Sequence, residues 1–363
     1  MNIIIRVDSS NIIGTGHIMR CISLGLRLQM SGNNVKFISK KLKYNIIDKI
    51  SKHFDVFIIP KGYYDMTLDP ETWFGESVES DCLKCINVIK PLNIDVLIID
   101  QYAIDYRWEF MMSKYVKKIF VFDDTHTNKH FCDILLSYAC VDLTIYENLV
   151  PNHCKIFQGI KYLPIHSKYL EYGKMEKKFN NPIKKIVVTL GGSDPLNDTK
   201  TVLQILDKIC KKKLTELEID VIIGGSNKYY DDICYYCKDK PSFNIHQNVN
   251  NMEIIYNDAD FCIGAVGTSA IERALLGIPT FLILLANNQK DLFDTFIKNE
   301  LAYSYIYKID ETIESIKKNA FDMLSIVFND LYTNNHKLRK ISDRCKSFVS
   351  CDGIKEICDE IMR

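Results

Sequence analysis

The chain has 363 residues, of which 47% are hydrophobic and 25% are charged, a composition typical of soluble globular proteins. Its length indicates two domains rather than one. Its 46 Lys and Arg residues balance 46 Asp and Glu residues, so the charge gives no reason to expect a nucleic-acid partner or a membrane surface.

No segment predicts a membrane span or a signal peptide. The apolar run at residues 280–286 is too short to cross a bilayer, and Arg6 and Asp8 interrupt the short apolar run near the N-terminus. Among the 13 cysteines, several lie in apolar runs, which favours reduced, buried thiols in a cytoplasmic protein over a disulfide framework. The C-x-x-C pairs at 82–85 and 234–237 lie in helical patterns without knuckle residues, so packing is favoured over metal binding.

The chain opens with an apolar strand at residues 3–7, followed by a loop that tightens at Gly14 and Gly16. His17 then begins a segment with helical apolar spacing that Gly32 ends. The free N–H groups of a helix N-terminus favour anions and disfavour imidazolium, so we expect a neutral His17 that can accept a proton. A capping histidine in an ordinary strand-to-helix turn is the alternative, and the local sequence leaves both open.

Near-continuous apolar runs predict more strands in the first half, and such runs are typical of parallel strands covered on both faces. The expected strands are residues 35–39, 93–100 and 118–124, with a short edge strand at 134–136. The stretch from about residue 146 to residue 182 is rich in Tyr, Lys, Asn and Pro. We interpret it as an irregular connection between domains.

Strands alternate with helical segments again in the second half. The expected strands are residues 186–190, 219–223, 260–263 and 279–285, and the chain after them is mostly helical and charged. This α/β alternation predicts two Rossmann-like domains facing across a cleft, at residues 1–160 and 183–340, followed by a helical tail at 341–363.

Three glycine loops follow strands of the second half, at residues 191–194, 224–227 and 264–269. Each alone is weak evidence, because glycine commonly follows a strand, but together they predict a ligand cradle at the carboxyl edge of the sheet. The chain has no Walker A motif, and its first glycine loop lacks the third glycine of a dinucleotide fingerprint. A nucleotide bound by the second half is therefore favoured over a redox dinucleotide bound by the first, and no cofactor is expected.

The third loop carries groups suited to a nucleotide. Thr268 and Ser269 can donate hydrogen bonds to phosphate oxygens, as can the free N–H groups of the helix that begins there. Glu272, about one turn into that helix, can accept both hydroxyls of a ribose, and complementing the helix dipole is an equally open interpretation. The expected nucleotide-binding residues are Gly191, Gly192, Ser193, Gly267, Thr268, Ser269 and Glu272.

Several segments match one known family in their order along the chain: residues 13–21, 99–102, 108–109, 122–124, 189–195, 264–272 and 288–289. Over roughly residues 1–300 this set resembles the UDP-2,4-diacetamido-2,4,6-trideoxy-β-L-altropyranose hydrolases, the nucleotide-sugar hydrolases of bacterial pseudaminic (nonulosonic) acid synthesis. The resemblance implies the B-type glycosyltransferase fold and a metal-free, inverting hydrolysis of the bond between sugar C1 and UDP. It also implies that His17 is the general base and that Glu272 binds the nucleotide.

The expected mechanism stabilises charge on the departing UDP and activates one water. The helix N-terminus at residues 268–269, with the loop at 191–193, would hold the developing charge, and a neutral His17 would take the proton of the water. No metal is expected, because there is no compact Asp-x-Asp motif beside the phosphate loops, and the neighbours Asp123 and Asp124 point to opposite faces of a strand. The expected substrate-binding residues are Asp8, Gly14, Gly16, Arg20, Asp100, Tyr102, Asp124 and Asn288.

Alternatives remain open at this point. Asp8 and Asp100 can equally be structural caps at strand ends. Related spore-coat and polysaccharide glycosyltransferases share the fold, so transfer of the sugar to an acceptor other than water is the main alternative function. A non-catalytic sensor that binds a UDP-sugar without turnover is another. The expected partner is a UDP-sugar substrate, and no pattern indicates an oligomeric state.

Overall fold

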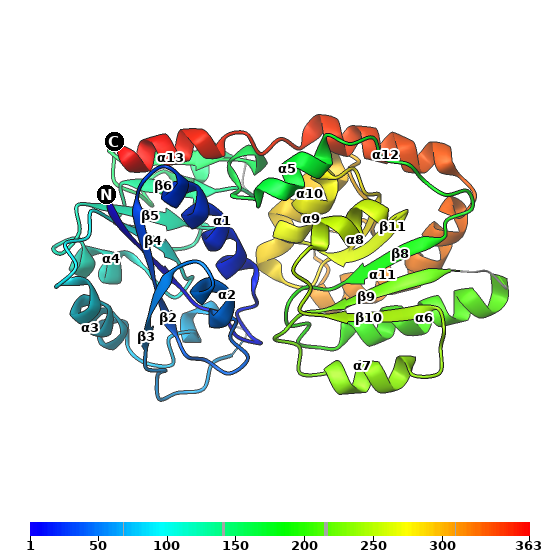
Figure 1. Ribbon diagram of the computed structural model, residues 1–363, viewed down its shortest axis with the longest axis horizontal. Coiled ribbons are helices and arrows are strands. Elements are labelled where there is room, and N and C mark those ends of the chain that lie inside the picture. The colour runs from blue at the N-terminus through cyan, green and yellow to red at the C-terminus, as the bar shows by residue number, and fades with distance from the viewer. Residues whose placement is uncertain (68, 140–141, 214–216, 309) are drawn as a thin grey trace. The chain divides into compact units, whose positions relative to one another are not determined.

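The computed structural model describes residues 1–363 with the exception of 68, 140–141, 214–216 and 309 (Figure 1). The chain forms two compact units, the first from Met1–Ile165 with Cys351–Arg363 and the second from His166–Ser350. Each unit has its own parallel sheet with helices on both faces. None of the helices in the described ranges is long and apolar enough to cross a membrane.

The first unit is built on a seven-stranded parallel sheet of order β3-β2-β1-β4-β5-β6-β7. Its strands are β1 (Asn2–Val7), β2 (Asn34–Lys40), β3 (Asp55–Ile59), β4 (Val96–Asp100), β5 (Lys118–Phe122), β6 (Ile134–Ser137) and β7 (Lys155–Gln158). The strand order reverses between β1 and β4, which lie side by side with Val7 opposite Asp100. The carboxyl ends of these two strands therefore form the switch point at which open α/β sheets bind ligands.

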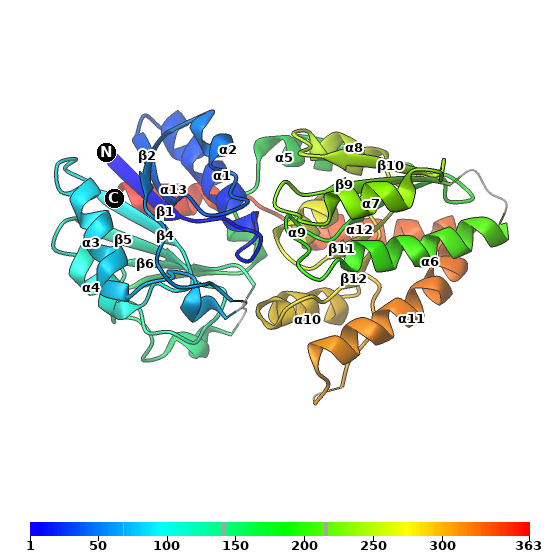
Figure 2. The ribbon, with the colours of Figure 1, turned by 90° about the horizontal axis from the view of Figure 1, so that it is seen from below.

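Helices cover both faces of this sheet, because alternate side chains of each buried strand point to opposite faces. They are α1 (Gly16–Met30), α2 (Ile47–Ser51), α3 (Val78–Ile89), α4 (Tyr106–Met112) and α13 (Ile354–Met362), with short 3-10 turns η1 (Pro70–Thr72), η2 (Leu143–Tyr146) and η3 (Ile160–Tyr162). Ile3 and Ile5 of β1 pack in one core with residues of α1 and α13, whereas Ile4 packs in the other core with residues of α3 and α4. Figure 2 shows α3 and α4 side by side at one flank of the sheet.

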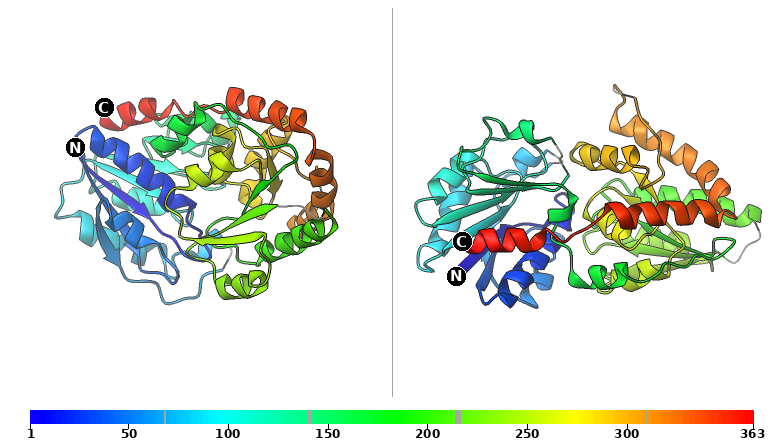
Figure 3. Two further views of the ribbon diagram at one scale, coloured as in Figure 1. Left: turned by 45° about the vertical axis from the view of Figure 1, so that its right-hand side comes forward. Right: turned by 90° about the horizontal axis from the view of Figure 1, so that it is seen from above.

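Both ends of the chain belong to the first unit (Figure 3). The Asn33 side chain joins them, because its oxygen accepts a hydrogen bond from the N-terminal amine of Met1 and its nitrogen donates to the sulfur of Met362. Helix α13 contacts α1 and buries Ile354, Ile357, Cys358 and Ile361 in the core of this unit.

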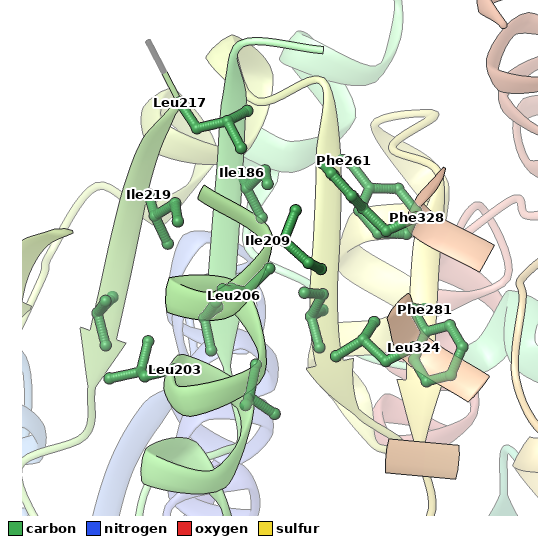
Figure 4. Close-up of a cluster of buried hydrophobic side chains, with 14 of the residues drawn as sticks. Ile186, Leu203, Leu206, Ile209, Leu217, Ile219, Phe261, Phe281, Leu324 and Phe328 are labelled. Atoms are coloured by element: carbon green, nitrogen blue, oxygen red, sulfur yellow. The ribbon is translucent and has the colours of Figure 1, made fainter. Parts of the chain in front are cut away.

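The second unit has a five-stranded parallel sheet of order β10-β9-β8-β11-β12. Its strands are β8 (Lys185–Thr189), β9 (Glu218–Ile223), β10 (Phe243–Gln247), β11 (Phe261–Ala265) and β12 (Thr280–Ile283). Its helices are α5 (Ser167–Gly173), α6 (Asp198–Lys213), α7 (Tyr230–Cys237), α8 (Met252–Asp258), α9 (Thr268–Leu275), α10 (Lys290–Lys298), α11 (Ile313–Leu331) and α12 (Asn335–Phe348), with a 3-10 turn η4 (Asn287–Gln289). Figure 4 shows one face of this sheet, where Leu206 of α6 and Phe328 of α11 pack over strand residues such as Ile186 and Phe261.

The structure differs from the sequence-based prediction at several elements. Residues 134–136 form β6, but this strand is not at the edge, because β7 pairs with it. Strand β7 and helix α5 lie inside the stretch 146–182 that we interpreted as irregular, and β3 and β10 were not predicted. The residues of the predicted tail at 341–363 are divided, with α12 in the second unit and α13 in the first.

Candidate active site

His17 lies in the first turn of α1, directly after the glycine turn that leaves β1. Gly14 has a φ of +87°, a left-handed conformation that glycine adopts without a steric penalty, and its N–H donates to the Ser10 carbonyl at 2.9 Å. Gly16 is the first residue of α1, and no side chain caps that end of the helix. The turn thus delivers the imidazole of His17 to Asp100 at the end of β4, where His17 Nδ1 lies 2.6 Å from Asp100 Oδ1.

Arg20, one turn further along α1, binds two carboxylates beside His17, those of Asp100 and Asp124. Its Nε and Nη2 donate to the two oxygens of Asp100, both at 2.6 Å, and its Nη1 donates to Asp124 Oδ2 at 2.6 Å. Tyr102 also donates its hydroxyl to Asp124 Oδ2, at 2.6 Å. Burial alone would raise the pKa of the Asp100 carboxyl, but the charges and hydrogen bonds of Arg20 and His17 outweigh it and lower that pKa well below its ordinary value.

Aromatic rings enclose the imidazole. The ring of His17 meets Tyr102 edge-on with centroids 4.7 Å apart, and Trp73 edge-on at 6.2 Å. Trp73 stacks on Tyr102 at 5.5 Å. These contacts leave His17 with a side-chain exposure of only 11%, which limits the rotation of the ring. Trp73 was not predicted as a site residue, because it follows the short turn η1 in a segment without periodic spacing.

One carboxylate oxygen of this cluster makes no hydrogen bond to the described residues. Asp124 Oδ1 is buried and has no hydrogen-bond partner within the described ranges. A buried polar atom without a partner is destabilising in the unliganded protein and can be satisfied by a ligand that supplies a donor.

Asp8 has a different environment from Asp100, although both carboxylates end adjacent strands. Asp8 Oδ1 accepts hydrogen bonds from Arg6 Nη1 at 2.6 Å and from the Lys40 N–H at 2.7 Å, and Asp8 Oδ2 accepts one from Gln101 Nε2 at 2.9 Å. Its side chain has no exposed surface. These contacts favour the structural interpretation of Asp8 over a substrate contact.

In the second unit, the loops after β8 and β9 pack directly on one another. A Cβ at Gly224 would lie 2.2 Å from the Gly192 carbonyl oxygen, and one at Gly225 would lie 2.3 Å from Asn248 Oδ1. Glycine is therefore required at Gly224 by the contact between backbones. Gly191 has a φ of +88°, and Ser193, two residues further along, is half-buried. The loops after β8 and β9 thus form one connected surface at the carboxyl edge of this sheet.

The N-termini of α6 and α9, both at this edge, differ in their free N–H groups. The N-terminus of α6 is occupied by its own chain, because the Asp194 carboxylate accepts the N–H groups of Asp198 at 2.8 Å and Thr199 at 2.9 Å. The N-terminus of α9 follows Gly267, which has a φ of +156°, and no side chain caps it. Thr268 and Ser269 in its first turn are half-buried. The N-terminus of α9 therefore has more backbone N–H groups available to bind an anion than the N-terminus of α6.

Glu272 lies about one turn into α9 and is half-buried. Burial raises the pKa of its carboxyl to about 7, against the lowering effects of the Arg273 charge and of a hydrogen bond from the Tyr169 hydroxyl on α5. Asn288 lies on η4, beyond the end of β12, and is exposed. Within the described ranges, no three His, Cys, Asp or Glu side chains are grouped so that they could hold a metal ion.

The predicted site residues thus form two groups, each inside one unit. His17, Arg20, Asp100, Tyr102 and Asp124 make one hydrogen-bonded cluster around the start of α1. The predicted nucleotide residues lie in the glycine loops and at the start of α9 in the second unit.

Searches against known proteins find relatives of low identity. No family model matches the chain. It is 27% identical over 311 residues to UDP-2,4-diacetamido-2,4,6-trideoxy-beta-L-altropyranose hydrolase of Campylobacter jejuni, a match that covers 85% of this chain and 100% of that protein. It is 26% identical over 365 residues to an uncharacterized protein of Methanocaldococcus jannaschii, covering 96% of this chain and 69% of that protein. A shorter match, 23% identical over 147 residues, joins 40% of this chain to 42% of the spore coat polysaccharide biosynthesis protein SpsG of Bacillus subtilis.

Solved structures of the same architecture share almost no sequence with the chain. A complex of S. aureus MnaA with UDP has a TM-score of 0.66 at 9% identity, covering 99% of this chain and 96% of that chain. MurG of Acinetobacter baumannii has a TM-score of 0.59 at 12% identity, covering 99% of each chain. With the two parallel sheets described above, these likenesses confirm the predicted α/β fold, two Rossmann-like domains of the B-type glycosyltransferase class.

The ion pair between Arg20 and Asp100 gives a testable prediction of stability. Asp100→Asn leaves the buried guanidinium with one carboxylate in place of two, so we expect the first unit to lose about 3 kcal/mol or more of unfolding free energy. Both tryptophans, Trp73 and Trp108, lie in the first unit, so their fluorescence in a urea titration reports its unfolding. The matched control is Asp55→Asn, because Asp55 pairs with Lys36 but its side chain is 75% exposed; its loss should stay below about 1 kcal/mol. Equal losses in the two variants would contradict the prediction.

Proposed function

We propose that the protein hydrolyses a UDP-linked 2,4-diacetamido-2,4,6-trideoxy sugar at C1, with inversion and without a metal, and so releases UDP and free sugar for pseudaminic acid synthesis. The observation that carries this proposal is the pair of His17 with a carboxylate whose pKa is lowered, Asp100, inside the cluster held by Arg20. The match to the Campylobacter jejuni hydrolase over its whole length supports the substrate class.

The hydrogen bond between His17 and Asp100 assigns the tautomer of the imidazole. An ionised Asp100 can only accept, so the proton in this bond is on Nδ1 of His17. Nε2 then keeps its lone pair and can take a proton from a water that attacks C1. The positive charge that develops on the ring would be stabilised by Asp100, which Arg20 holds in place with two hydrogen bonds. A general base of this kind contributes about 10²–10⁴-fold in rate.

Departure of UDP needs little help from a proton donor, because a nucleoside diphosphate is a stable anion. In the proposed complex, the uncapped N-terminus of α9 at Thr268 and Ser269 binds the diphosphate, supported by the loop at Gly191, Gly192 and Ser193. Glu272 accepts the ribose hydroxyls. The proposed sugar contacts are Tyr102 and Asp124 of the first unit and Asn288 of the second. Asp124 Oδ1, which has no hydrogen-bond partner within the described ranges, is an acceptor for a hydroxyl or acetamido N–H.

The direct test is release of UDP from UDP-2,4-diacetamido-2,4,6-trideoxy-β-L-altropyranose by the purified protein, with no acceptor present. We expect UDP and free sugar in equal amounts, the same rate in the presence of EDTA, and the inverted anomer in proton NMR spectra taken before mutarotation. UDP release only after a sugar acceptor is added would identify a glycosyltransferase, a function compatible with the shorter match to the spore coat polysaccharide biosynthesis protein SpsG. Loss of turnover in EDTA that Mg²⁺ restores would contradict the metal-free mechanism.

Replacement of His17 tests the assignment of the base. His17→Gln keeps a polar side chain but removes the basic nitrogen, so we expect kcat to fall by roughly 10²-fold or more while the Kd for UDP stays unchanged. The control is His153→Gln, because His153 also lies in the first unit near an acid, Asp133 at 3.3 Å, but on the surface. Normal turnover of His17→Gln, or a parallel loss of UDP binding, would show that another group is the base.

The pKa of Glu272 predicts a pH dependence of nucleoside binding. If the ribose hydroxyls donate to the carboxylate, the ionised form binds them, and with a pKa of about 7 the affinity should rise about tenfold between pH 6 and pH 8. Uridine is the probe for calorimetry, because it has no phosphate that titrates in this range. Glu272→Gln should remove the rise, whereas a rise that persists in this variant would assign it to another group.

A further inference from the structure

A buried guanidinium lies beneath the turn between β11 and α9. Arg273 belongs to α9 and has no exposed surface. Its Nη2 donates to the carbonyl of Ala265 at 2.8 Å, and its Nη1 donates to the hydroxyl of Ser269 at 3.2 Å. Ala265 is the last residue of β11 and Ser269 lies in the first turn of α9. One side chain therefore ties together the two sides of this turn.

Gly264 has no side chain, and this leaves space for the guanidinium of Arg273. A Cβ at Gly264 would lie 2.7 Å from the central carbon of the guanidinium and less than 3.0 Å from both of its terminal nitrogens. The guanidinium thus lies directly against the Gly264 backbone. A glycine inside a buried strand usually marks a close approach of another group, and here that group is Arg273.

Among the described residues, Arg273 has no ion-pair partner, in contrast to the other large buried arginines. Arg6 pairs with Asp8 and Asp81, and Arg20 pairs with Asp100 and Asp124. For Arg273, the described residues supply only neutral acceptors, and its Nε has no hydrogen-bond partner at all.

The acid nearest in sequence does not neutralise this charge fully. Glu272 acts on Arg273 through its charge, but its own carboxyl has a pKa of about 7, so near neutral pH it carries only part of a negative charge. Burial of a charge without a counter-ion is strongly unfavourable. The site at the start of α9 is therefore electropositive from two sources, the helix N-terminus and the guanidinium beneath it.

We propose that Arg273 is a positioning residue for a nucleoside diphosphate: it holds the turn at residues 265–269 in shape and supplies a buried positive charge for which the diphosphate is the counter-ion. The guanidinium does not touch the ligand and acts through the turn and through its field. This role rests on the nucleotide site of the proposed function and extends it, because it assigns the preference for a diphosphate over a nucleoside to a residue outside the glycine loops.

The test compares the affinities for UDP and uridine, measured by calorimetry at constant pH and salt. Arg273→Met removes the charge and keeps an apolar side chain of similar length. We expect it to weaken UDP binding roughly tenfold while uridine binding changes less than twofold. Arg273→Lys keeps the charge and should retain most of the preference for UDP. The control is Arg344→Met, which removes a charge from the same unit at a surface residue paired with Glu300 and should leave both affinities unchanged.

A merely structural role would weaken UDP and uridine in parallel, and that result would overturn the proposal. An unchanged ratio of the two affinities in Arg273→Met would do the same. If Arg273→Met does not fold, the lysine variant decides, because loss of the preference for UDP in folded Arg273→Lys contradicts a role of the charge. Wild-type protein that turns over the UDP-sugar but fails to prefer UDP to uridine would overturn this role alone, whereas wild-type protein that binds neither ligand would overturn the nucleotide site with it.

Discussion

The Asp100 carboxylate joins the end of β4 to the first turns of α1, and the arrangement of the first unit around the site depends on it. His17 and Arg20 bond to its Oδ1, and Arg20 and the Cys21 thiol bond to its Oδ2. All of these donors come from five consecutive residues of one helix, so the acid fixes both the position of α1 and its rotation about its axis. This geometry is possible because β4 lies next to β1, from which the chain enters α1.

A second buried network supports the site from the other side without touching His17. Asp81 binds Arg6 and Lys40, and Lys40 also donates its ammonium to the Phe74 carbonyl and to Glu76. This network holds the segment that carries Trp73 against Tyr102. The first network orients the imidazole through its hydrogen bonds, and the second encloses it by placing an aromatic ring.

The sequence predicted the members of the His17 cluster better than it predicted their contacts. His17 and Arg20 were both predicted as site residues, and their spacing of three residues places them on one face of α1. That Asp100 meets them required the strand order, because 83 residues separate it from His17. Asp8 and Asp100 look alike in sequence, each ending an apolar strand. Their environments differ because Arg6 and Gln101 flank Asp8, and no local pattern distinguishes the two.

Two of the strands missed by the sequence pattern share a physical cause. Strands β7 and β10 are short edge strands with partly exposed side chains, so they lack the continuous apolar run that marks a buried parallel strand. Helix α13 has clear amphipathic spacing, which predicts a helix with one buried face. The spacing does not indicate which of the two units that face packs against. Only tertiary packing assigns it to the sheet that begins the chain.

The buried arginines of the two units show why charge is retained in these cores. A buried ion pair is weak evidence for stability, since apolar side chains of similar size often replace it without loss. Arg20 is paired with both Asp100 and Asp124, so its ion pairs hold a fixed geometry, which suits the general base proposed at His17. Among the described residues, Arg273 bonds to neutral acceptors and has no carboxylate at ion-pair distance, so its charge is neutralised less than that of Arg20, which suits the anion site proposed for the second unit. Under the proposed roles, the same residue type contributes rigidity in the first unit and electrostatic attraction in the second, and the difference lies in whether the fold supplies a full counter-ion.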